Sequence, residues 1–134
     1  MTTLNRLVCI SMLLVSCLSN AQSFYGTPKL KISESGLDRV VERIDASNAP
    51  SVACEIREID GKYYWATRGG KQLVKIESGA FEIYVDATGG GYIKVVKPEL
   101  KNSVAAMSNT EKQFDYIEHL TLGLRTVTYW GNKR

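Results

Sequence analysis

The chain has few cysteines, and their positions argue against a disulfide-stabilised module. Only three cysteines occur in 134 residues. Cys9 and Cys17 lie within the first 21 residues, so Cys54 is the sole thiol once that segment is removed, and no internal disulfide can then form. Small secreted domains in oxidising compartments usually carry several cysteines. The scarcity therefore favours a bacterial envelope protein with an adequate core over a eukaryotic extracellular module.

The N-terminal apolar run is too short to cross a membrane as a mature helix. It extends over twelve residues, from Leu7 to Leu18, whereas a spanning helix needs about 20. The run follows the lone positive charge of Arg6 and precedes the small residues Ser19-Asn20-Ala21. This arrangement is typical of a secretory signal peptide cut after Ala21. We expect residues 1–21 to be a signal peptide and residues 22–134 to form a single domain, which is periplasmic or secreted.

A second processing route ends at Cys17. The segment Leu14-Val15-Ser16-Cys17 resembles the bacterial lipobox, in which the cysteine becomes the lipidated N terminus. The protein would then be an outer-membrane lipoprotein, and this lipid anchor is the only membrane contact that we expect. Mass spectrometry of the mature protein distinguishes the two routes, because either residues 1–21 or residues 1–16 are lost. An intact Met1 would contradict export.

Strong charge and clustered histidines are also missing. The formal net charge is +3 and falls to +2 without Arg6, which gives no indication of a nucleic-acid partner. His119 is the only histidine, and Asp115 precedes it by four residues, so on a helix at most these two side chains would share a metal. Cys54 adds a thiol to this pair, but nothing in the spacing indicates a catalytic triad. We expect no metal, no cofactor and no catalytic residue that the sequence can locate.

What the sequence does contain is a series of short turns between residues 52 and 97. The turn dipeptides are Asp60-Gly61, Gly69-Gly70 and Ser78-Gly79. Glycine, and less easily Asp or Asn, adopts the positive φ that two-residue hairpin loops require. The three turns therefore predict consecutive antiparallel strands. A fifth strand, at 92–97, follows the glycine-rich loop 86–91.

Counting outward from these turns gives a single register with one apolar and one wet face. The apolar face carries the aligned residues Ile56, Trp65, Val74 and Ile83, with Cys54 beside them, and a second row of Tyr63, Ile76 and Phe81. Side chains alternate between faces, so the neighbouring positions lie on the wet face. These are Tyr64, Tyr84, Arg57 and Lys75, with Glu82 opposite Lys75. Tyr92 on the fifth strand joins them.

Apolar periodicity elsewhere predicts helices. Leu37, Val40, Val41 and Ile44 recur with helical spacing and predict a helix at about 34–46. A capping box at 108–111 predicts a second helix that carries Phe114, Ile117 and His119, and a short helix follows Pro98; residues 125–130 predict a last strand. The expected fold is α+β: an antiparallel β-meander of five to six strands with two or three helices packed on one face.

These expectations together predict that the protein binds a partner and is not an enzyme. Exposed aromatic side chains on a rigid sheet can stack on sugars or anchor a partner protein. We therefore expect an exported, non-catalytic envelope protein that contacts a protein or glycan through the sheet face bearing Tyr64, Tyr84, Tyr92, Lys75 and Arg57. The alternative is a small exported hydrolase whose active site the sequence does not locate.

Overall fold

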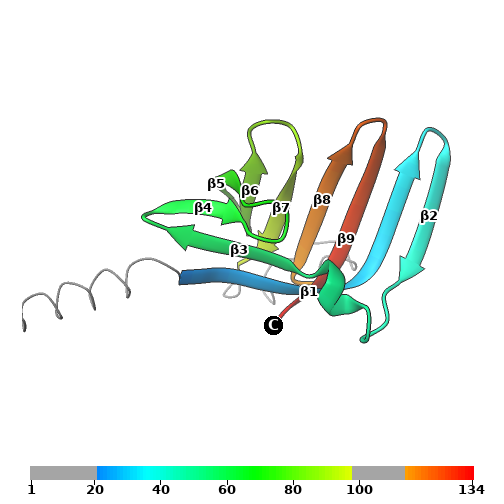
Figure 1. Cartoon of the computed structure of the whole chain (residues 1–134), viewed down its shortest axis with the longest axis horizontal. Coiled ribbons are helices and arrows are strands. Elements are labelled where there is room, and N and C mark those ends of the chain that lie inside the picture. The colour runs from blue at the N-terminus through cyan, green and yellow to red at the C-terminus, as the bar shows by residue number, and fades with distance from the viewer. Residues whose placement is uncertain (1–20, 98–113) are drawn as a thin grey trace, which may run out of the picture.

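The computed structural model describes residues 21–97 and 114–134. Within these ranges the chain forms nine antiparallel strands and one short 3-10 helix, η1 (Ala49–Val52) (Figure 1). The strands are β1 (Ala21–Ser35), β2 (Asp38–Arg43), β3 (Cys54–Ile59), β4 (Lys62–Trp65), β5 (Lys71–Ser78), β6 (Phe81–Asp86), β7 (Gly91–Val96), β8 (Tyr116–Leu122) and β9 (Arg125–Lys133). The predicted signal peptide up to residue 20, the lipid-attachment site at Cys17, and the predicted capping box and short helix lie outside the described residues.

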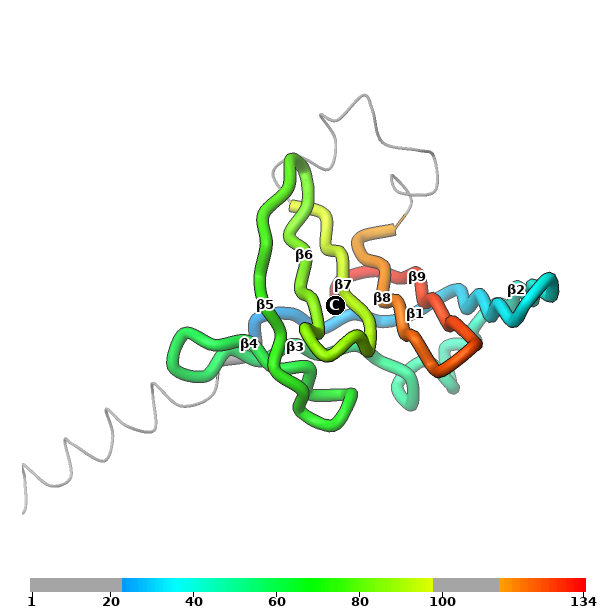
Figure 2. The backbone as a smooth tube through the Cα atoms, turned by 90° about the horizontal axis from the view of Figure 1, so that it is seen from above, coloured from blue at the N-terminus to red at the C-terminus, as the bar shows by residue number. Residues whose placement is uncertain are grey.

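The sheet closes on itself through β1. Strands β3 to β9 follow one another as an up-and-down meander, with each strand paired to the next. The first part of β1, Ala21–Gly26, pairs with β3, and its second part, Gly26–Ser35, pairs with β9. These pairings connect eight strands in a ring, which Figure 2 shows from above. The closed sheet therefore has an inner face, an outer face and two open ends.

Strand β2 stands outside this closed sheet. It pairs only with the second part of β1, and the two strands project together to one side of the molecule (Figures 1 and 2). All six residues of β2 are exposed. We call this projecting β1–β2 hairpin the flange.

The helix predicted at 34–46 is wrong, because these residues form the flange. Gly36 adopts a φ of 60° in the turn that reverses the chain, and Leu37 is fully exposed beside it. Val40 and Val41 are β-branched and prefer extended backbone. Both faces of the flange are open at β2, so its residues show no burial alternation that would have distinguished a strand from a helix.

The helix predicted after Ser108 is also wrong over its described part. Residues 116–122 form β8, in which Tyr116, Glu118 and Leu120 point inward and Ile117 and His119 point outward. Alternation with a period of two is therefore present in the sequence, but a glutamate occupies one of the inner positions. The fold is accordingly an antiparallel β-sheet without packed helices among the described residues. The antiparallel meander of the prediction is confirmed.

Of the three predicted hairpins, the first is confirmed, and the other two have different registers. In the third, residues 79–80 and not 78–79 form the turn, so Ile76 pairs with Ile83 instead of Phe81. Asp60-Gly61 pairs Ile56 with Trp65, as expected. Gly69-Gly70 is not a two-residue turn, because both glycines end a five-residue loop at 66–70 with φ of 71° and 68°. Trp65 therefore pairs with Lys71 instead of Val74.

This three-residue shift exchanges the two faces of β5 and β6. Leu73 and Tyr84, predicted to be wet, are buried, whereas Val74 and Ile76, predicted to be core, are about half exposed. The interior is filled by large side chains from every strand of the closed sheet, including Phe24, Ile56, Trp65, Leu73, Tyr84, Ile93, Val95, Tyr116, Leu120, Val127 and Tyr129. Gly26 lets β1 pass close to the inner face, since a Cβ there would overlap the ring of Tyr116.

Candidate functional site

A charged group lies at the centre of the interior. Glu118 is completely buried, yet both of its carboxylate oxygens accept hydrogen bonds. Trp65 Nε1 donates to Oε2 at 2.8 Å, and Arg68 Nη2 donates to Oε1 at 2.8 Å. A buried carboxylate is tolerated where a cation and further donors satisfy it. Glu118 therefore joins β8 to β4 and to the loop after β4.

The loop at 66–70 holds Arg68 over one open end of the closed sheet. The Arg68 and Gly70 amides both donate to the carbonyl of Trp65, at 3.1 and 3.0 Å. Burial alone would lower the pKa of the Arg68 guanidinium, but its hydrogen bond to Glu118 and the charge of Glu118 outweigh burial and raise it. The guanidinium also lies over the ring of Tyr129, 5.6 Å from its centroid. Arg68 is therefore a permanently charged, partly buried side chain.

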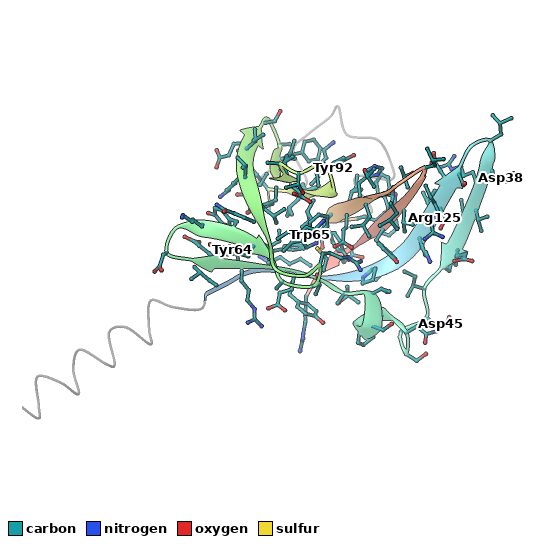
Figure 3. The ribbon with its side chains drawn as sticks, turned by 45° about the horizontal axis from the view of Figure 1, so that its top comes forward. Asp38, Asp45, Tyr64, Trp65, Tyr92 and Arg125 are labelled. Atoms are coloured by element: carbon teal, nitrogen blue, oxygen red, sulfur yellow. The ribbon has the colours of Figure 1, made fainter. Side chains whose placement is uncertain are left out.

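A cavity of about 280 Å³ opens beside Arg68. We call this end of the closed sheet the mouth; the connections after β4, β6 and β8 all lie there, because alternate connections of a meander share an end. Aromatic and basic side chains converge on the cavity: Trp65 and Tyr129, with Lys31, Arg68, Lys71 and Arg125. Figure 3 shows Trp65 and Arg125 on this side of the molecule. Leu120 and Val127 complete an apolar wall.

The loop between β6 and β7 is organised by Asp86. This buried carboxylate accepts hydrogen bonds from the Thr88 amide at 2.9 Å, the Thr88 hydroxyl at 2.6 Å and the Gly90 amide at 3.2 Å. Lys71 Nζ lies 3.4 Å from it. The hydrogen bonds from Thr88, more than the ion pair with Lys71, hold the pKa of Asp86 below its ordinary value.

Asp86→Asn should lower the free energy of unfolding at neutral pH by about 1–3 kcal/mol, the range for hydrogen bonds to a charged group. Because the folded-state pKa is depressed, the ionised carboxylate stabilises the fold above the unfolded pKa, and this contribution is lost as the pH falls below about 4. Urea unfolding of both proteins across this range should show the difference shrinking in acid. Asp38→Asn, at the exposed tip of the flange, is the control and should show no such trend. A constant difference would contradict the assignment.

A second cavity, of about 430 Å³, has a different character. It is lined by Phe24, Tyr84, Val95 and Val96 and by the carboxylates Glu82 and Asp115, with Ser23 and Lys133. It shares no lining residue with the mouth cavity. Four cations line the mouth cavity, whereas two carboxylates and one lysine line this second cavity.

The residues of the predicted tyrosine face do not form one surface. Tyr64 and Arg57 are outward neighbours on β4 and β3, and Tyr92 lies outward on β7, with β5 and β6 between them (Figure 3). Tyr84 is only 3% exposed. It points inward, so Tyr84→Ala would remove core packing. The premise that these tyrosines share a wet face is wrong.

Lys75 belongs to the inner face as well. It lies 3.9 Å from Glu82, so the predicted ion pair is present, although not on a wet face. The predicted alignment is wrong, because Tyr84 and not Glu82 lies opposite Lys75. Its ammonium also lies 5.4 Å from the ring centroid of Tyr63. These contacts connect β5 to β4 and β6, so Lys75 interacts with residues of the fold and is not free to bind a partner.

The groups weighed for catalysis or metal binding do not converge. His119 stacks on Tyr92, with centroids 5.0 Å apart, and its Nδ1 lies 3.0 Å from the Thr128 hydroxyl on the outer face. Cys54 is inside, where burial, and then the charge of Glu118, raise its thiol pKa. Asp115 accepts a hydrogen bond from the Lys133 amide at 2.8 Å. Asp115 and His119 are four residue steps apart along extended chain, about 13 Å, which is too far for one metal.

Several residues of the mouth were missed by sequence reasoning. Glu118 was assigned to a helix, and Arg68 directly preceded the predicted turn Gly69-Gly70 and was given no role, so neither was expected inside. Tyr129 was correctly placed on the last strand, but its face was not predicted. The available signal is the alternation of Tyr116, Glu118 and Leu120, which puts a carboxylate among apolar inner positions.

Comparison with known proteins adds no family to these observations. No protein-family model, curated protein or solved structure matches this chain. Within residues 21–97 and 114–134, no helix has the length and apolarity needed to span a bilayer. Over the same ranges, no group of three or more His, Cys, Asp or Glu side chains is placed to hold a metal ion.

Proposed function

We propose that this chain is an exported, non-catalytic binding protein that accepts a small ligand at the mouth of its closed sheet. The observation that carries the proposal is the 280 Å³ cavity, in which Trp65, Arg68 and Tyr129 converge. Small-molecule sites are typically concave and largely apolar, with a few placed polar groups, and hold about 300–1,000 Å³. The mouth cavity, of about 280 Å³, is just below this range.

The walls of this cavity are held in place before any ligand arrives. Trp65 and Arg68 are fixed by their hydrogen bonds to Glu118. Lys71 is held by Asp86 and by the pairing of its strand. Preorganised side chains lose little conformational entropy on binding, which favours affinity. The proposal moves the binding site from the tyrosine face to the interior, and retains a binding protein of the envelope.

The size of the cavity also limits the kinds of partner that can bind in it. A folded protein surface needs about 800 Å² of contact on each side for a stable complex, whereas this cavity admits a small molecule or the end of a chain, such as a terminal sugar. Export is proposed on the N-terminal sequence pattern described above, and the mass of the mature protein tests it.

Fragment titration with detection by amide NMR tests the binding site. We expect small fragments to shift the amide signals of Arg68, Gly90 and Leu120 at the mouth, and to leave Ser23 and Val95 at the other end unchanged. Leu122→Trp should abolish these shifts by filling the entrance, because Leu122 lines the cavity and is already 47% exposed.

Leu124→Trp is the matched control for this experiment. Leu124 is 99% exposed at the neighbouring turn and does not line the cavity. The control variant should bind fragments as the unmodified protein does. Binding that survives Leu122→Trp, or shifts confined to the opposite end, would overturn the proposal.

A further inference from the structure

The mouth carries more positive charge than its own carboxylates neutralise. Four cations line the cavity, and two of them are matched: Arg68 by Glu118 at 2.8 Å and Lys71 by Asp86 at 3.4 Å. Neither Lys31 nor Arg125 forms an ion pair with a carboxylate of the described residues. Glu42 is the cross-strand neighbour of Lys31 on the flange, but it does not line the cavity. The entrance is therefore left with two unmatched cations.

Lys31 and Arg125 belong to strands that border the cavity together. Lys31 is aligned with Tyr129 across the β1–β9 pair, and Tyr129 lies buried on the inner face. Aligned residues of a β-ladder share a face, so Lys31 is directed to the same side. Arg125 is the first residue of β9 and is aligned with Leu122, another residue of the entrance. The two side chains thus approach the cavity from adjacent strands.

Arg68 has one buried donor without an acceptor in the part of the chain that the structure describes. Arg68 Nε is buried, yet it has no hydrogen-bond partner among the described residues. A guanidinium carries five N–H donors in a fixed plane, and Nη2 alone donates to Glu118. A buried donor without an acceptor costs about 1–3 kcal/mol. Nε has almost no accessible surface, so a ligand in the cavity would not reach it. An oxyanion there would instead neutralise the cations at the entrance.

The other walls are apolar. Trp65, Leu120, Val127 and Tyr129 lie beside the cations, and all four are buried in the closed sheet. An inorganic ion would leave these surfaces in contact with water, whereas an apolar group attached to the oxyanion would cover them. The site is thus suited to a ligand with one charged end and one apolar end.

We infer that the ligand of the mouth is a small organic anion, with a carboxylate or phosphate group on Lys31 and Arg125 and an apolar body against Trp65 and Tyr129. This inference rests on the proposed function and adds the chemical class of the ligand. It distinguishes the mouth, which four cations line, from the opposite cavity, where the carboxylates Glu82 and Asp115 outnumber the one cation, Lys133.

Trp65 provides an internal reporter of binding. The chain has two tryptophans, Trp65 and Trp130, so Trp130→Phe leaves Trp65 as the only one. Phenylacetate, phenyl phosphate, neutral phenylacetamide and inorganic phosphate are titrated separately into this variant, and Trp65 fluorescence is followed. Both organic anions should bind at least 10-fold more tightly than the amide, and their affinity should fall as salt is added. The two anions separate carboxylate recognition from phosphate recognition.

Charge removal completes the test. Lys31→Gln combined with Arg125→Gln should weaken the organic anions at least 10-fold and leave phenylacetamide unchanged. Lys62→Gln, at the exposed start of β4 and the other end of the sheet, is the control for lost positive charge and should have no effect. Arg68 is left unchanged, because its removal would leave the buried carboxylate of Glu118 without its cation.

The outcomes separate this inference from the proposed function. Equal binding of phenylacetamide and phenylacetate at the mouth would contradict the inference that the ligand is an anion, but it would still support the proposed binding function. If inorganic phosphate binds as tightly as phenyl phosphate, the inference that the ligand carries an apolar group is wrong. If none of the four probes binds while neutral fragments still shift the mouth amides, the ligand class is wrong. If no fragment of any charge binds there, the proposed function itself fails.

Discussion

Trp65→Ala should lower the free energy of unfolding by about 3–5 kcal/mol, the range for truncation of a large buried aromatic side chain. The indole is only 1% exposed, so its removal leaves a cavity in the middle of the closed sheet. It also removes the Nε1 donor from Glu118. The loss should therefore fall at the upper end of the range, measured by urea unfolding with circular dichroism.

Tyr64→Ala is the control one residue away. Tyr64 points to the outer face and is partly exposed, and it is not part of the interior cluster. Its replacement should cost much less than that of Trp65. Trp65→Phe, which retains most of the volume but not the N–H, should lie between the two. Equal losses at Trp65 and Tyr64 would mean that the assigned faces of β4 are wrong.

The hairpin that carries Trp65 was predictable because its turn sequence is unambiguous. Asp60 adopts a φ of 52° and Gly61 a φ of 77°, so both central residues have the positive values of a two-residue loop. The pairing of Ile56 with Trp65 follows from counting. The buried position of Cys54, the strand after the glycine-rich loop 86–91 and the last strand were predicted on similar grounds, and each is confirmed.

The register of β5 was not predictable in the same way. A Gly-Gly pair indicates that the backbone adopts positive φ, but not whether two or five residues form the loop. Here Glu55 and Thr67 help decide: the Glu55 amide donates to the Thr67 hydroxyl at 3.1 Å, and the Ala66 amide donates to the Glu55 carbonyl at 2.9 Å. These contacts close a longer loop, and each depends on a residue from another strand.

Closure of the sheet was not predicted, because the composition of β1 is not typical of a strand. Gly26 and Pro28 within residues 22–32 are typical of a loop, because proline cannot donate to a strand ladder. Irregularities between Gln22 and Phe24, and between Pro28 and Leu30, accommodate this segment. The contacts that make β1 a strand come from β3 and β9, which are distant in sequence. Local propensity contains no information about them.

The mouth could be predicted only in part for the same reason. Lys31, Arg68 and Arg125 lie on β1, the β4–β5 loop and β9, and no spacing in the sequence relates them. Once β1 pairs with β9, Lys31 and Arg125 necessarily border the same opening. The candidate site is thus a consequence of closure, which the sequence pattern did not reveal.

Arg68→Met should destabilise the fold more than Glu118→Gln, although Arg68 is the more exposed partner of the pair. Removal of Arg68 leaves a carboxylate with no exposed surface and without its cation, which costs about 3–5 kcal/mol for a buried pair. Glu118→Gln removes the charge but keeps an amide oxygen that can accept from Trp65. The remaining guanidinium, whose side chain is 26% exposed, can turn toward water, so the cost should be about 1–3 kcal/mol.

The double variant Arg68→Met/Glu118→Leu should be more stable than Arg68→Met alone, because it removes the buried charge together with its partner. Urea unfolding of the unmodified protein, Arg68→Met, Glu118→Leu and the double variant gives the coupling between the two residues. Arg39→Met is the matched surface control: Arg39 pairs with Glu34 at 3.6 Å, but both side chains are more than half exposed. Its loss should cost no more than about 1 kcal/mol. If Arg68→Met were equally mild, water would have to reach Glu118, and the closed interior described for the mouth would be wrong.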